Sequence, residues 1–159
     1  HQNVGVDPDV LLLAKGLGGG FPIGAMVAYG EYQDLMTQGL HGTTYGGNAV
    51  ACSAALSVLE TVEREDLMSR AKFIEAEFVS HISNAPGVEQ VRGAGAMLGV
   101  VLNHENSAAI EAKSRELGLI INAPLPNVLR IVPPLVITDE ELRDGIQLLT
   151  QALGDCETL

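Results

Sequence analysis

The spacing of apolar residues predicts four helices of more than ten residues. In three of them, apolar side chains recur at three- and four-residue steps and so gather on one helical face. Two helices carry start signals: Asn48 is a good N-cap, and Thr138 precedes Glu141 by three residues, the spacing of a capping box. The predicted helices cover residues 48–64, 67–82, 106–117 and 138–153.

Short apolar runs predict the strands. Residues 10–14 form a continuous apolar run, which is typical of a strand covered on both faces in a parallel sheet. Residues 23–29 predict a second strand, and residues 31–37 a short helix. Beyond the helix at 67–82, the order of elements is ββαββα. The four strands expected there cover residues 88–92, 96–102, 119–122 and 128–132, the last two separated by the breaker-rich segment 123–127.

The basic residues are unevenly distributed along the chain. Lys15 is the only lysine or arginine before residue 64, and the other eight follow from Arg64 onward. This change in composition predicts a domain boundary, with one domain over residues 1–63 and a small α+β domain over residues 64–159. The fold class expected for the whole chain is α/β.

Composition excludes several functions. A net charge of −11 argues against nucleic-acid or anionic-membrane binding, because both need a clustered basic surface. The run at 10–14 is too short to span a bilayer, so we expect a cytoplasmic protein. Cys52 and Cys156 predict two inert thiols and no disulfide framework. Because residue 1 is histidine, we expect the chain to be a piece of a longer polypeptide.

Lys15 is the leading candidate for chemistry. It ends an apolar run, no other cation lies near it in the sequence, and glycine follows at positions 16, 18, 19 and 20. Such a lysine is expected to be desolvated, which lowers its pKa and provides a neutral amine for a Schiff base with a carbonyl cofactor such as pyridoxal phosphate (PLP). A structural ion pair is the alternative. Nucleotide binding is disfavoured, because the glycine spacing fits neither the phosphate-loop nor the dinucleotide pattern.

Two further segments are candidates for anion binding. In the loop 41–48, Thr43 and Thr44 offer hydroxyl groups before a helix N-terminus, an arrangement suited to phosphate, although an ordinary loop leading into a helix has the same pattern. Arg130 lies in an apolar run, so its guanidinium needs a protein or substrate carboxylate. For Arg92 we expect a salt bridge at the rim. No metal site is predicted, because the four histidines lack ligand spacing.

Several linked motifs resemble those of class III PLP-dependent aminotransferases. They lie at residues 8–9, 14–25 and 41–48, and the motifs at 92–95, 121–123 and 129–130 are most similar to the acetylornithine branch. The resemblance covers essentially the whole chain, but only the C-terminal portion of such an enzyme. It implies a fold-type I transferase, with residues 1–63 ending the large PLP-binding domain and residues 64–159 forming the small domain.

The resemblance also implies roles for single residues. Lys15 matches the lysine that forms the Schiff base and moves the proton, and Thr44 matches the threonine that reaches the cofactor phosphate of a neighbouring subunit. The enzyme would then be at least a homodimer. Arg130 matches an arginine that recognises a substrate carboxylate. Departures from the family pattern, which do not touch this chemistry, occur at Ala49, where proline is frequent, and at 12–13, where small hydroxyl residues are common.

The implied reaction moves the terminal amino group of N-acetylornithine, or a close relative, to 2-oxoglutarate, as in arginine biosynthesis. Ornithine, succinylornithine and 4-aminobutyrate remain alternative donors, and a non-catalytic phosphate- or nucleotide-binding module is the alternative of another class. The cofactor-binding aspartate, stacking aromatic residue and main phosphate loop of the family lie upstream of such a portion. We therefore expect these 159 residues alone to be inactive.

Overall fold

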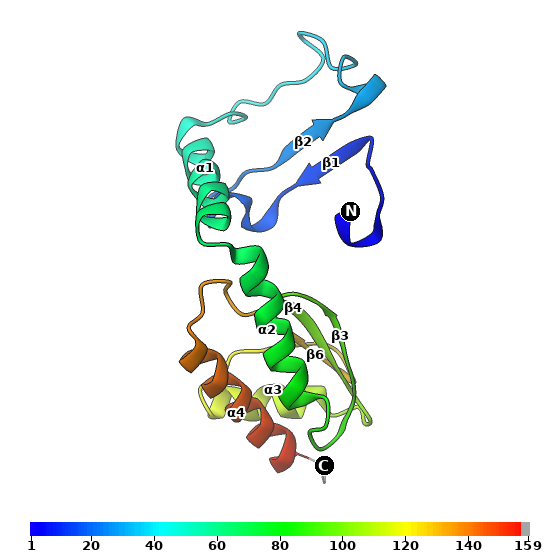
Figure 1. Ribbon diagram of the computed structural model, residues 1–159, viewed down its shortest axis with the longest axis vertical. Coiled ribbons are helices and arrows are strands. Elements are labelled where there is room, and N and C mark those ends of the chain that lie inside the picture. The colour runs from blue at the N-terminus through cyan, green and yellow to red at the C-terminus, as the bar shows by residue number, and fades with distance from the viewer. Residues whose placement is uncertain (157–159) are drawn as a thin grey trace. The chain divides into compact units, whose positions relative to one another are not determined.

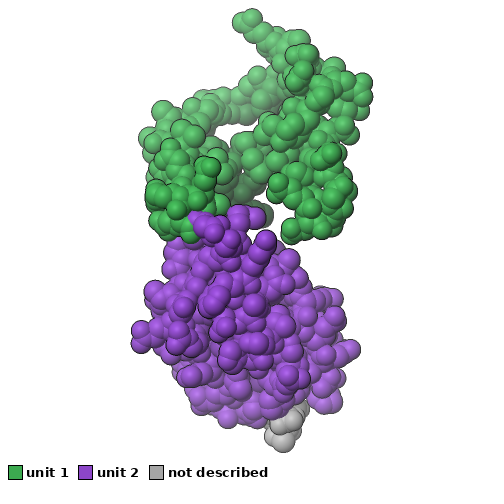
Figure 2. Space-filling model, viewed as in Figure 1, with its two compact units in different colours: residues 1–65 green, residues 66–159 purple. Residues whose placement is uncertain are grey.

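The computed structural model describes residues 1–156, and the chain divides into two compact units. Unit 1 comprises residues 1–65, and unit 2 begins at Asp66 (Figures 1 and 2). The mixture of helices and strands agrees with the expected α/β class. The assignment of residues 1–63 and 64–159 to two domains of a larger enzyme stays a prediction.

Unit 1 contains a two-stranded antiparallel sheet. β1 (Val10–Leu13) pairs with β2 (Ala25–Ala28), and Leu13 lies opposite Ala25. The prediction of a parallel strand covered on both faces is wrong, since Leu12 is 74% exposed. The connection over residues 14–24 is too short for the crossover that parallel strands require, whereas a short loop suits antiparallel pairing.

One long helix, α1 (Ala49–Arg64), follows in unit 1. Its start is set by Asn48, whose side-chain oxygen accepts hydrogen bonds from the amides of Val50 and Ala51, each at 3.1 Å. This confirms the predicted N-cap. The short helix expected at 31–37 is wrong: only the 3₁₀ turn η3 (Gly30–Tyr32) forms, because a short isolated segment seldom offsets the cost of nucleating a helix. Unit 1 also holds η1 (Gln2–Val4) and η2 (Lys15–Gly18).

Unit 2 is an α+β sandwich of one sheet and three helices. Its sheet has the strand order β3-β4-β6-β5, and every neighbouring pair is antiparallel. The elements appear in the predicted ββαββα order after the leading helix (Figure 1). Their bounds are α2 (Leu67–Ile82), β3 (Val88–Ala94), β4 (Met97–Leu102), α3 (Ser107–Glu116), β5 (Asn122–Leu125), β6 (Val128–Ile131) and α4 (Asp139–Asp155).

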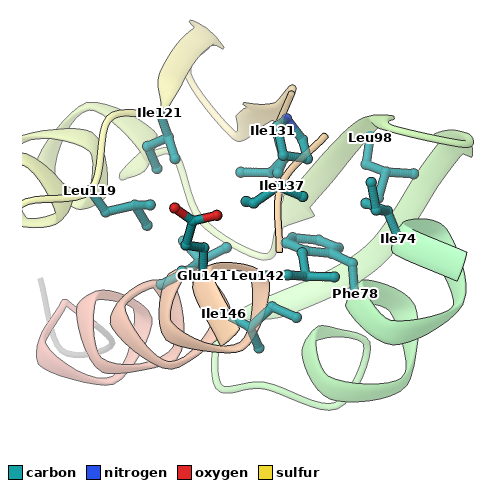
Figure 3. Close-up of a pocket in the computed structure, with 13 residues that line it drawn as sticks. Ile74, Phe78, Leu98, Leu119, Ile121, Ile131, Ile137, Glu141, Leu142 and Ile146 are labelled. Carbon is teal, nitrogen blue, oxygen red and sulfur yellow. The ribbon is translucent and has the colours of Figure 1, made fainter. Parts of the chain in front are cut away.

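The main core lies between the helices and one face of this sheet. Leu98, Val100 and Leu102 alternate along β4 and are buried against the helices, as are Leu129 and Ile131 of β6. Alternation sends the intervening residues to the other face. An apolar cavity of about 110 Å³ remains between α2, α4 and the sheet (Figure 3).

Glu141 is the one acidic residue that lines this cavity, and it is held by the predicted capping box (Figure 3). Both the amide and the hydroxyl of Thr138 donate to Oε2 of Glu141, at 2.9 and 2.8 Å, and Oγ1 of Thr138 accepts from the Glu141 amide at 3.2 Å. These bonds lower the pKa of the Glu141 carboxyl, the Thr138 amide contributing most. The cap therefore fixes where α4 begins.

β5 begins three residues later than predicted. The sequence favoured a strand at 119–122, whereas the observed strand includes Pro124. Proline is tolerated here because β5 is an edge strand and needs fewer ladder hydrogen bonds. The pairing with β6 is also irregular between Asn122 and Leu125.

Candidate active site

Lys15 is separated from β1 by a single residue, Ala14, and occupies the first position of the η2 turn. Its backbone φ is +58°, in the left-handed region that residues other than glycine seldom adopt. Holding a lysine there costs about 1–3 kcal/mol, and such strain concentrates at functional sites. The turn thus gives a conformational reason to regard Lys15 as functional, which the sequence pattern alone does not provide.

The side chain of Lys15 is exposed. The expected desolvation is therefore wrong for this chain, because β1 has a single partner strand and its end is not covered by other described residues. The alternative of a structural ion pair finds no support either, since no carboxylate among residues 1–156 pairs with Lys15. Its amine is accessible and unpaired within these residues.

The glycine-rich loop after Lys15 packs along α1 (Figure 1). Gly18 is buried, and a Cβ atom on Gly19 would lie 3.1 Å from Cγ2 of Val58. Further along the loop, Phe21 lines a shallow hollow with Ala49 in the first turn of α1. Glycine is favoured at position 19, because its φ of +57° is left-handed and a Cβ there would press on Val58.

The second candidate segment leads into the other end of α1. Thr43 and Thr44 are exposed, and the Thr43 carbonyl accepts a hydrogen bond from the Gly46 amide at 3.4 Å. Oγ1 of Thr43 also lies against Gly46, so close that a Cβ there would be 2.5 Å from it. The two hydroxyl groups are accessible, and that of Thr43 lies over the open side of Gly46.

The helix N-terminus itself offers less to an anion than expected. The amides of Val50 and Ala51 are already bound by the side chain of Asn48. Two amides at the helix N-terminus are therefore in use, whereas the hydroxyl groups proposed for phosphate, those of Thr43 and Thr44, remain exposed. Within residues 1–156, no hydrogen bond joins Lys15 to either threonine.

Arg130 lies in β6 of unit 2 and is exposed. The expectation that this guanidinium is enclosed by apolar neighbours is wrong, because Leu129 and Ile131 face the core and alternation turns Arg130 to the opposite face. Arg92 of β3 is also exposed, and the salt bridge expected for it is absent from the part of the chain that the structure describes. Sequence reasoning did not connect these two arginines.

Other chemistry has little structural basis. Cys52 and Cys156 are both free; burial, followed by the neighbouring charge of Asp155, raises the pKa of the Cys156 thiol. Among the described residues, no three potential ligands form a metal-binding group. No helix described by the structure has both the length and the apolar character needed to cross a bilayer.

A lysine at a strand end, a glycine loop packed on a long helix and a separate α+β unit form the arrangement expected of the C-terminal portion of a fold-type I transferase. The sequence model of the family "Aminotransferase class-III" matches residues 1–153. The chain therefore belongs to the class III aminotransferases, which confirms the family inferred from its motifs.

Individual relatives agree with this assignment. The chain is 46% identical over 155 residues to acetylornithine aminotransferase of Corynebacterium efficiens, covering 98% of this chain and 38% of that protein. It is 44% identical over 155 residues to the Mycolicibacterium smegmatis acetylornithine aminotransferase, covering 96% of this chain and 40% of the relative. The chain thus spans about two fifths of the length of these curated relatives.

Solved structures give the same fold. The crystal structure of acetylornithine aminotransferase from Elizabethkingia anophelis has a TM-score of 0.87 at 32% identity, covering 97% of this chain and 43% of that one. An ornithine aminotransferase from Toxoplasma gondii, which has partial occupancy of PLP at its active site, has a TM-score of 0.88 at 32% identity. This match covers 98% of the present chain and 38% of the Toxoplasma gondii chain. These matches confirm the expected fold class.

Proposed function

We propose that the protein containing this chain is a PLP-dependent aminotransferase that moves the terminal amino group of N-acetylornithine, or a close relative, to 2-oxoglutarate. The observation that carries the proposal is Lys15, an exposed and unpaired amine in a left-handed turn at the end of β1. Membership of the class III family and identities of 46% and 44% to acetylornithine aminotransferases support it. We also propose a cytoplasmic enzyme that is at least a homodimer.

The residues present suit PLP, an aldehyde that carries a phosphate. Lys15 supplies a primary amine, while Thr43 and Thr44 supply accessible hydroxyl donors for phosphate oxygens. When bound, PLP supplies an aldehyde for a primary amine and an electron-withdrawing ring that stabilises negative charge on the substrate carbon. The donor set of the chain therefore agrees with the cofactor on which its family depends.

Lys15 has two tasks in this proposal. Its Nζ would first hold the cofactor through the aldehyde carbon. Once displaced by the substrate amine, it would take a proton from the amine-bearing substrate carbon and give it to that cofactor carbon. Both tasks need an amine that no carboxylate holds, which agrees with the absence of an ion pair to Lys15 in residues 1–156. The left-handed backbone sets the direction in which the side chain leaves the turn.

Thr44 and Thr43 bind the phosphate group in this proposal. Their hydroxyls donate hydrogen bonds to anionic oxygens, which are stronger than bonds between neutral groups. The Asn48 cap ties the end of their loop to α1, and this reduces the freedom lost on binding. We assign Thr44 to the phosphate of a neighbouring subunit, so the active site would need two chains.

Arg130 binds a substrate carboxylate in this proposal. Its position on an exposed sheet face leaves the guanidinium available, and the planar fork of arginine matches the two oxygens of a carboxylate. Amino donor and 2-oxo acid both carry such a group, so Arg130 serves both halves of the reaction.

Ornithine is the second candidate donor. The observation in its favour is the TM-score of 0.88 to the ornithine aminotransferase of Toxoplasma gondii. The higher identity to acetylornithine enzymes favours the acetylated donor. Turnover of the full-length protein with each donor in turn separates the two, since the enzyme proposed here has the higher kcat/KM for N-acetylornithine.

The test of the function is the variant Lys15→Ala in the full-length protein. The proposal predicts loss of the visible absorbance of bound cofactor and loss of turnover. Lys72→Ala is the matched control, because Lys72 is an exposed lysine of α2 without an acidic partner in the described residues. If Lys15→Ala kept absorbance and turnover as Lys72→Ala does, the chain would instead act as a non-catalytic module.

A further inference from the structure

Arg92 and Arg130 lie in one row across the sheet of unit 2. Arg92 of β3 is paired with Gly99 of β4, and Gly99 is paired with Arg130 of β6. Directly paired residues of antiparallel strands point their side chains to the same face. Both guanidinium groups therefore leave the sheet on the face opposite the helices.

The residue between the two arginines has no side chain. Cγ and Nε of Arg92 lie 3.6 and 3.7 Å from the position that a Cβ atom on Gly99 would take, so the arm of Arg92 passes over Gly99. Two strand spacings separate the backbones of Arg92 and Arg130 by about 10 Å. Half of that separation is within the reach of one extended arginine side chain.

A hollow of about 380 Å³ occupies this part of the sheet face. Arg92, Gly99 and Arg130 line it, and Met97, Pro124 and Val128 add apolar walls. Apolar walls lower the local dielectric, which strengthens the attraction between a guanidinium and an anion. The hollow combines two cations with walls of low polarity.

Neither arginine is neutralised by a carboxylate in the described part of the chain. The protein has 20 acidic and 9 basic residues, yet no carboxylate among residues 1–156 pairs with Arg92 or Arg130. Five other basic residues do have acidic partners, namely Arg64, Arg70, Lys113, Arg115 and Arg143. In so acidic a chain, two unpaired guanidiniums at one hollow indicate a site for an external anion.

We propose that Arg92 is a second substrate-binding residue, which shares with Arg130 one carboxylate of the amino-acid or oxo-acid substrate. Arg130 approaches the carboxylate from β6 and Arg92 from β3, across the space left open at Gly99. The inference rests on the proposed function of Arg130, and it adds a residue to which neither the motifs nor the comparisons give a role. Gly99 serves as the spacer that lets both side chains reach the same anion.

A double-mutant cycle on the full-length holoenzyme tests this inference. The probe is glutarate, a dicarboxylate that has no amino or oxo group and cannot react, and the readout is its dissociation constant by calorimetry. Arg92→Gln and Arg130→Gln should each weaken binding by about 10- to 100-fold. The double variant should weaken it by clearly less than the product of the two, because both side chains contact one carboxylate. Multiplicative losses, or no loss in Arg92→Gln, would overturn the proposal.

Three further variants separate direct binding by Arg92 from other causes of a weakened glutarate affinity. Arg143→Gln removes the same charge from α4, and equal weakening there would reduce the effect to net charge and overturn the proposal. Arg92→Lys keeps the charge without the planar fork, so its dissociation constant for glutarate should lie between those of the wild type and Arg92→Gln. If Arg92→Gln fails to fold, Arg92→Lys takes its place in the test. Gly99→Val fills the space between the two arginines and should weaken glutarate binding, because its side chain would lie where the arm of Arg92 crosses the sheet.

Failure of this inference and failure of the proposed function give different results. Glutarate binding involves no turnover, so it reports on carboxylate recognition and not on catalysis by Lys15. Cofactor attachment at another lysine would defeat the proposed function while leaving the cycle intact. Attachment at Lys15 with a normal affinity in Arg92→Gln would defeat only the role of Arg92.

Discussion

Gly19 lies directly against Val58, since a Cβ atom on Gly19 would be 3.1 Å from Cγ2 of the valine. Gly19 also has a φ of +57°, which glycine adopts readily and other residues seldom do. Close approach and backbone conformation thus require the same residue. The contact holds the loop after Lys15 on α1, the helix whose N-terminus anchors the loop of Thr44.

Substitution at this contact should loosen the loop. Gly19→Ala is expected to destabilise the protein by about 1–2 kcal/mol through left-handed strain, with added pressure on Val58. Adding Val58→Ala to Gly19→Ala should restore only the share of the lost stability that comes from the contact between the two side chains. Denaturant unfolding of the full-length protein measures both variants, and an unchanged midpoint in Gly19→Ala would contradict the assigned conformation.

The backbone of Lys15 leads to a prediction that is independent of its chemistry. Lys15→Gly and Lys15→Ala both remove the amine, but only glycine relieves the left-handed strain at φ +58°. Lys15→Gly should therefore be more stable than Lys15→Ala by roughly 1 kcal/mol. Thermal unfolding without cofactor makes the comparison, and equal midpoints would mean that the turn is not strained at Lys15.

Thr44 is expected to affect cofactor affinity rather than stability. Thr44→Val removes the hydroxyl at nearly constant volume and should raise the PLP dissociation constant by about tenfold or more. Thr37→Val is the control, since Thr37 is exposed in a neighbouring segment of unit 1. Equilibrium titration of the apoenzyme gives both constants. Equal affinities in the two variants would remove Thr44 from the phosphate site.

The lowered pKa of Glu141 predicts a dependence of stability on pH. A carboxyl with a depressed folded-state pKa contributes stability above its ordinary value of 4.5, and this contribution is lost as the pH falls through the folded pKa. Glu141→Gln keeps the capping geometry without the charge. It should be less stable than wild type near pH 7, and the gap should close in acid. A gap that is constant with pH would contradict the ionised cap.

Local signals were sufficient for much of the fold. The cap at Asn48 and the capping box at Thr138 each involve residues within three positions of one another, so sequence spacing finds them. β5 was placed too early because Pro124 reads as a breaker unless its strand is known to lie at an edge. Strand order is set by contacts between distant segments, which spacing does not reveal.

In the candidate site, too, local sequence features were predictable and contacts between distant segments were not. Motif spacing singled out Lys15, Thr44 and Arg130 by residue type, but not their exposure or the left-handed turn at Lys15. The tight β3–β4 turn could have paired Arg92 with Gly99, because counting back from the turn fixes a hairpin register. The pairing of Gly99 with Arg130 could not be counted, because α3 and β5 intervene in the sequence.

The central claim is that Lys15 holds the cofactor, and borohydride reduction of the full-length holoenzyme tests it most directly. Reduction fixes a lysine-bound PLP as a stable pyridoxyl group, and peptide mapping by mass spectrometry then locates that group. The account predicts the label on Lys15, in the peptide that joins β1 to the glycine loop. A label on any other lysine, or none, would contradict it.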